Sequence, residues 1–107
     1  MPTTAPGTRV IEEEETQEAP LFHLILLDDD DHTYEYVILM LGRVFGYGKE
    51  KAFAIACAVD AEGQAVVMTG PKAELENKQQ QIHAFGADPL LERCMGSMSA
   101  ILEPVSG

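Results

Sequence analysis

The stretch FHLILLDDDDH, residues 22–32, organises the fold. Its first six residues are mostly apolar, and they stop at four consecutive aspartates. A short apolar run bounded in this way is typical of a largely buried β-strand. Aspartates at the start of a helix interact favourably with its dipole and can cap its free N–H groups. We therefore expect a strand over residues 22–27 and a helix that begins after Asp31.

The remaining pattern predicts two more helices and two more strands. Apolar residues recur at helical spacing in three windows: from after Asp31 to Gly46, between Lys49 and Asp60 with a stop near Gly63, and from Gly70-Pro71 to Gly86. Strands are expected over residues 64–69 and 97–102. In the last strand, Met98, Ala100 and Leu102 alternate with Ser97, Ser99 and Ile101. The helix faces expected to be buried carry Val37, Ile38, Leu41, Val44 and Phe45, then Ala52, Ile55, Ala56 and Val59, then Leu75, Ile82 and Phe85.

The element order is strand, helix, helix, strand, helix, strand. It predicts an α+β domain with a three-stranded antiparallel sheet and three helices on one face. We assign this domain to residues 21–107. Residues 1–20, with Pro2, Pro6 and the run Glu12 to Glu15, offer almost no apolar surface, so they are expected to be a flexible acidic extension. Both a solvated leader and a segment that contacts a partner fit this composition.

The charge of the chain excludes several functions. The formal net charge is −11, and residues 1–31 hold nine acids and one base, whereas residues 32–107 hold nine acids and six bases. Nucleic-acid binders need a basic face against phosphate, and anionic membranes also attract basic surfaces. We therefore expect neither as a partner. No apolar run is long enough to span a bilayer, no secretory signal is visible, and two cysteines make no disulfide framework, so a cytoplasmic location is expected. We also expect a monomer.

The run Asp28 to Asp31 holds more acids than helix capping requires, which indicates a cation site or a solvated patch. A metal ion and a protonated amine are the two candidate cations. An EF-hand loop would need glycine at its sixth position and glutamate at its twelfth, but Thr33 and Leu39 stand there. We predict no metal and no cofactor.

No catalytic arrangement is visible in the sequence. Cys57 lies in the middle of an apolar helix, which is typical of an inert thiol. The three histidines, His23, His32 and His83, fall on different elements without a serine motif or a phosphate-binding loop. We therefore do not expect an enzyme.

Two motifs resemble those of the ClpS family. The first is LILLDDD over residues 24–30 followed by YEYV over residues 34–37, which is similar to the family's apolar strand, Asn-Asp-Asp turn and Met-Glu-Phe-Val helix start. The second is Lys51-Ala52 with AVDAEG over residues 58–63, similar to the end of the family's second helix. The resemblance covers about residues 22–103, and the third helix and last strand match only loosely.

The resemblance implies an adaptor, because ClpS proteins bind the N-terminal residue of a substrate, an N-degron, and deliver the substrate to a Clp AAA+ unfoldase. A pocket takes a large hydrophobic first residue (Leu, Phe, Tyr or Trp), and polar groups at its rim hold the α-amino group. By position, the α-amino group would meet Asp28, Asp29 and Asp60. The pocket would be lined by Asp30, His32, Tyr34, Val37, Ala56, Val59 and Met98.

Five of these residues depart from the family's pattern, and the first is Asp28, which stands where the family has asparagine. Asp60 replaces a histidine, His32 a threonine, Tyr34 a methionine at the pocket mouth, and Ala56 a methionine in the pocket. The smaller Ala56 leads us to expect that Ile and Val are admitted as well.

The resemblance also places the unfoldase contact at Glu76 and Lys78, although an ordinary solvated helix face explains these two residues equally well. The rival interpretation is a stand-alone module of the same fold that binds N-terminal residues or another partner without delivering anything to an unfoldase.

Overall fold

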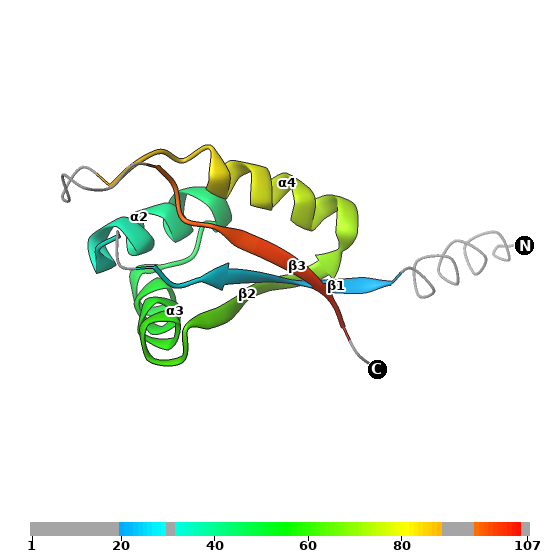
Figure 1. The fold of residues 1–107 in the computed structure, drawn as a ribbon, viewed down its shortest axis with the longest axis horizontal. Helices are drawn as coiled ribbons and strands as arrows, with labels where there is room; N and C mark the ends of the chain where they lie inside the picture. The colour runs from blue at the N-terminus through cyan, green and yellow to red at the C-terminus, as the bar shows by residue number, and fades with distance from the viewer. Residues whose placement is uncertain (1–19, 30–31, 89–95, 106–107) are drawn as a thin grey trace, which may run out of the picture.

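The computed structural model describes residues 20–29, 32–88 and 96–105 (Figure 1). The elements follow the expected order: β1 (Leu21–Leu27), α2 (Tyr34–Phe45), α3 (Lys49–Glu62), β2 (Gln64–Pro71), α4 (Lys72–His83) and β3 (Ala100–Pro104). The predictions for residues 1–19 and for Asp30 and Asp31 lie outside the described residues.

Strand β1 is the middle strand of an antiparallel sheet with the order β2-β1-β3. Ile25 pairs with Val66 on β2 and with Ile101 on β3. Because side chains alternate along a strand, Leu24 and Leu26 point to the opposite face from Ile25, where they are fully buried in the core. Val66 and Ile101 are exposed on the other face. The predicted α+β fold, with three helices and a three-stranded antiparallel sheet, is confirmed.

Helix α2 begins at Tyr34 because Thr33 caps it. The Thr33 side chain accepts a hydrogen bond from the Tyr36 N–H at 3.1 Å, and the buried Asp88 carboxylate accepts one from the Thr33 N–H at 2.6 Å. The expectation that the aspartate run supplies the cap is therefore wrong, since His32 and Thr33 separate that run from the helix. The helix ends at Gly46, whose φ of 76° suits a residue without a side chain.

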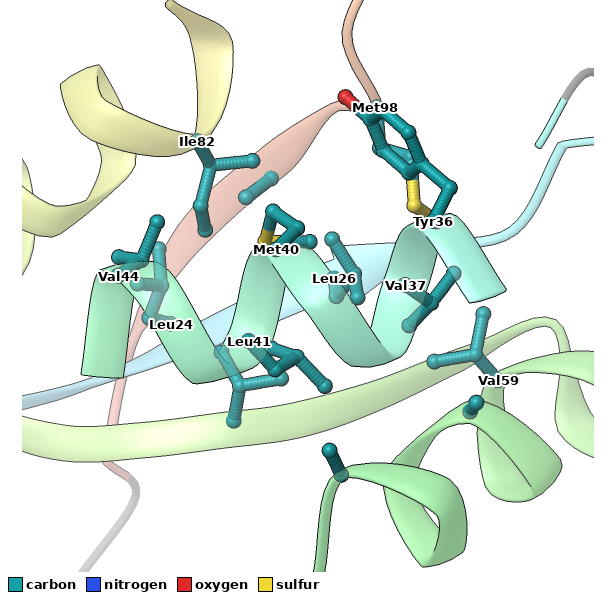
Figure 2. Close-up of a cluster of buried hydrophobic side chains, with 14 of the residues drawn as sticks. Leu24, Leu26, Tyr36, Val37, Met40, Leu41, Val44, Val59, Ile82 and Met98 are labelled. Carbon is teal, nitrogen blue, oxygen red and sulfur yellow. The ribbon is translucent and has the colours of Figure 1, made fainter. Parts of the chain in front are cut away.

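The buried face of α2 connects the other elements. Figure 2 shows Val37, Met40, Leu41 and Val44 pointing from α2 into the core, with Val37 directed toward Val59 of α3. Tyr36 and Met40 are buried in addition to the residues that the spacing predicted. Ile38, Phe45, Ile55 and Phe85 are only partly buried against this core, and Phe85 lies beyond the end of α4.

Strand β3 is shifted from its predicted position. It runs over Ala100–Pro104 instead of residues 97–102, so Met98 lies in the segment that leads into it. Ser97 is drawn toward the end of α4, because its hydroxyl accepts a hydrogen bond from the Gly86 N–H at 2.6 Å. The predicted alternation still holds, since Met98 and Ala100 are buried and Ile101 is exposed.

The packing makes a stability prediction with a matched control. Met40 is fully buried, whereas its neighbour Leu39 is 50% exposed. Met40→Ala should lower the free energy of unfolding by about 2–5 kcal/mol, because it removes buried methylene groups and leaves a cavity. Leu39→Ala should change it by only about 0.5 kcal/mol. Urea denaturation followed by circular dichroism measures both, and equal losses would contradict this account of the core.

Candidate functional site

A cavity of about 190 Å³ lies where β1 ends and α2 and α3 come together. Nine of the residues predicted to form a binding site line it: Asp28, Asp29, His32, Tyr34, Val37, Ala56, Val59, Asp60 and Met98. The tenth, Asp30, lies outside the described residues. The first and last of these residues, Asp28 and Met98, are 70 positions apart, so the fold brings distant segments to one place.

The floor of the cavity is apolar and buried. Val37 comes from α2, Ala56 and Val59 stand three positions apart on one face of α3, and Met98 comes from the segment before β3. All four side chains belong to the hydrophobic core and are at least nine-tenths buried. The floor therefore places apolar side chains next to a ligand group that enters the cavity, and burial of an apolar group is favourable.

The rim of the cavity is acidic. Asp28 and Asp29 follow β1 directly, and Asp60 stands in the last turns of α3; all three are exposed. The backbone holds this turn, because the Asp28 N–H donates a hydrogen bond to the Gly63 carbonyl oxygen at 3.0 Å. Carboxylates fixed around an apolar hollow suit a ligand that has a cationic group next to an apolar one.

Tyr34 bridges the mouth of the cavity. Its hydroxyl donates a hydrogen bond to the Asp60 carboxylate at 2.9 Å, which links α2 to α3. This bond to Asp60 raises the pKa of Tyr34 to about 12. The phenol is therefore protonated at neutral pH. Its ring also contacts the exposed ring of Phe53, with 5.7 Å between centroids.

Two buried side chains, His32 and Asp88, hold the chain between β1 and α2. The His32 ring is almost fully buried and contacts Asp29 and the carbonyl of Gly96 through its two nitrogens. Asp88, only 2% exposed, holds the start of α2 through the Thr33 N–H. Sequence reasoning missed Asp88, because it stands before a proline in a loop where no local pattern indicates a structural role.

Residues 17–90 match the family described as ATP-dependent Clp protease adaptor protein ClpS. The chain belongs to the ClpS family. It is 30% identical over 90 residues to the adapter protein ClpS of Rhodococcus opacus (strain B4), a match that covers 84% of this chain and 80% of that protein. It is also 35% identical over 69 residues to the E3 ubiquitin-protein ligase ubr-1 of Caenorhabditis elegans, covering 64% of this chain and 3% of that protein.

A solved structure of Agrobacterium tumefaciens ClpS2 bound to L-phenylalaninamide has the same fold. It superposes with a TM-score of 0.71 at 22% sequence identity, covering 82% of this chain and all of that chain. The matched family region includes the rim and most of the floor of the cavity but ends before Met98. The resemblance to the ClpS family predicted from the two motifs is therefore confirmed.

The other predicted residues lie away from this cavity. Glu76 is exposed on α4, whereas the Lys78 Nζ donates a hydrogen bond to the Val44 carbonyl oxygen at 2.9 Å and so supports the end of α2. His23 shares a hydrogen bond with Thr69, and the His83 Nε2 accepts one from the Ala100 N–H. The hydrogen bond of Lys78 to α2 is a structural contact, which distinguishes it from the exposed Glu76.

A second hollow, of about 590 Å³, is larger but lacks a buried floor. It is lined by Glu35, Ile38, Leu39, Gly42, Arg43, Tyr47 and Lys49 of α2, α3 and the turn between them. None of these side chains is fully buried. Within residues 20–29, 32–88 and 96–105, no cluster of three or more His, Cys, Asp or Glu residues could hold a metal ion. No helix among those residues is both long and apolar enough to cross a membrane.

The bond across the cavity mouth makes a prediction for the titration of Tyr34. In the unliganded protein Tyr34 should ionise near pH 12, because ionisation places a phenolate beside the Asp60 carboxylate. Asp60→Asn should move this ionisation back toward the ordinary tyrosine value of about 10. NMR of the tyrosine ring carbons follows the titration, with Tyr34→Phe assigning the signal. Ionisation of Tyr34 at the same pH in both proteins would show that the bond does not form.

Proposed function

We propose that this ClpS-family adaptor binds the free N-terminal residue of a protein, with the first side chain in the apolar cavity and the α-ammonium group at the acidic rim. One observation carries the proposal: a buried apolar floor and three exposed carboxylates, from segments far apart in the sequence, meet in one cavity. A free N-terminus with a hydrophobic first residue presents the complementary pair of groups.

The chemistry of the rim supports a charged amine. An ammonium group has three N–H donors, and a carboxylate accepts hydrogen bonds at about four lone-pair positions. Asp60 therefore has capacity for an ammonium N–H as well as the Tyr34 hydroxyl. Aspartate cannot donate to the peptide carbonyl, so this part of the recognition differs from a site that has histidine there. An N-acetylated peptide offers no charge to the rim.

The floor supports an apolar first residue. Burial of one large apolar side chain contributes about 1.5–3 kcal/mol, which alone does not give tight binding. Together with charge-assisted hydrogen bonds at the rim, it selects for both features of the ligand at once. Leu, Phe, Tyr and Trp are the expected first residues, and the small Ala56 side chain leaves room for the branched carbons of Ile and Val.

Delivery to a Clp AAA+ unfoldase is the second half of the proposal. Glu76 on α4 and the acidic extension before β1 are our candidates for that contact, together with Lys78. The same proposal places the protein in the cytoplasm as a monomer. The alternative is a recognition module without a delivery role. It draws support from the match to ubr-1, because that protein is a ubiquitin ligase by name and the match covers only 3% of it.

Peptide binding tests the recognition step. Fluorescence anisotropy should show that a peptide beginning with Leu or Phe binds, and that N-acetylation or a first Asp weakens binding at least tenfold. Asp29→Asn should weaken binding about tenfold, since a hydrogen bond to a charged group contributes about 1.5–3 kcal/mol. Glu62→Gln is the matched control, because Glu62 is exposed on α3 but does not line the cavity. Equal binding of the acetylated peptide would contradict amine recognition.

A pull-down with a purified Clp AAA+ unfoldase tests the delivery step. Glu76→Lys should reduce capture of the adaptor, because it reverses a charge on the proposed contact face. Glu103→Lys makes the same charge change on β3 and should leave capture unchanged. Peptide binding without any unfoldase capture by the unaltered protein would favour the stand-alone module.

A further inference from the structure

The His32 side chain lies between two hydrogen-bond acceptors. Its Nε2 is 2.8 Å from the carbonyl oxygen of Gly96, and its Nδ1 is 2.7 Å from the Asp29 Oδ1. The side chain is only 4% exposed, and its ring centroid is 4.6 Å from that of Tyr36. The ring is therefore held in one position, away from bulk water.

This geometry determines where the ring protons lie. A carbonyl oxygen can only accept, so Nε2 carries a proton. An ionised carboxylate can also only accept, so the short contact to Asp29 requires a second proton on Nδ1. A neutral ring would turn a lone pair toward the carboxylate at 2.7 Å. The arrangement thus fits an imidazolium ion paired with Asp29.

The two contacts of His32 join the rim of the cavity to the segment that carries Met98. Asp29 belongs to the acidic rim, whereas Gly96 stands two residues before Met98, which closes the apolar floor. In sequence, His32 and Gly96 are 64 positions apart. A side chain that bonds both segments fixes the distance between the rim and this part of the floor. The positive charge also offsets one of the three carboxylates that would otherwise repel each other.

We infer that His32, as an imidazolium ion, is a positioning residue that holds the Asp29 carboxylate and the Met98 segment in register for the N-terminal residue of a ligand. This inference rests on the proposed function. His32 acts through Asp29 and Met98: the amine meets the Asp29 carboxylate, and the apolar side chain meets Met98. Threonine, which the family resemblance places at this position, can neither carry the charge nor reach both partners with two ring nitrogens.

The protonation of the ring is testable without any peptide. Long-range ¹H–¹⁵N NMR at pH 7 should show protons on both nitrogens of His32. His83 is the internal control, because its Nε2 accepts a hydrogen bond and must lack a proton. Asp29→Asn should convert His32 to the neutral form with the proton on Nε2, since the carboxylate that requires the second proton is gone. A neutral His32 ring in the unaltered protein at pH 7 would overturn the inference.

Peptide binding then tests the positioning role. His32→Phe keeps an aromatic ring against Tyr36 but removes both hydrogen bonds, and it should weaken binding of a Leu-initiated peptide about tenfold. His32→Asn retains a donor toward Asp29 and should recover part of that loss. Unchanged binding by His32→Phe would overturn the positioning role. Absence of peptide binding in the unaltered protein, with both His32 nitrogens protonated, would instead overturn the proposed function.

Discussion

Strand β1 has a neighbour on each edge, so its backbone N–H and C=O groups are paired within the sheet and its direction is fixed. The rest of the site depends on this constraint. The chain leaves β1 at Leu27 on the side where α2 and α3 meet, which carries Asp28 and Asp29 to the rim of the cavity. The hydrogen bond from Asp28 N–H to Gly63 then ties this turn to the end of α3. Strand pairing and this backbone hydrogen bond thus position the two aspartates.

Part of the acidic excess of the chain lies at the rim of this cavity. An acidic surface alone would attract any cation, and an apolar hollow alone would accept many ligands. Here the carboxylates surround a small hollow whose floor is part of the hydrophobic core, so that a ligand must satisfy both conditions together. The Tyr34 hydroxyl donates a hydrogen bond to Asp60, and the His32 ring contacts Asp29, so both carboxylates have a polar partner within the protein. Such an arrangement reduces the cost of placing three carboxylates side by side.

The sequence predicted the fold well because local patterns determine it. Alternating and helical spacing located all six elements, and glycines marked the ends of α2 and α3. The bounds of β3 were wrong because a contact between Ser97 and Gly86, which no local pattern shows, bends the chain before the strand. The full set of cavity residues came from the family resemblance, because local spacing does not show which residues of different elements share a cavity. Three hydrogen bonds could not be predicted from the sequence either: those between Tyr34 and Asp60, His32 and Gly96, and Thr33 and Asp88. They join residues 26 to 64 positions apart, so no local pattern indicates them.

The central claim is that one cavity takes both the first side chain and the free amine of a peptide. Methyl NMR of the methionines tests this claim directly, because Met98 lies in the cavity while Met68 packs elsewhere against the core. A peptide that begins with Leu should shift the Met98 methyl signal and leave that of Met68 unchanged, and its N-acetylated form should shift neither at the same concentration. A Met98 signal that ignores the free peptide, or responds equally to the acetylated one, would contradict the account.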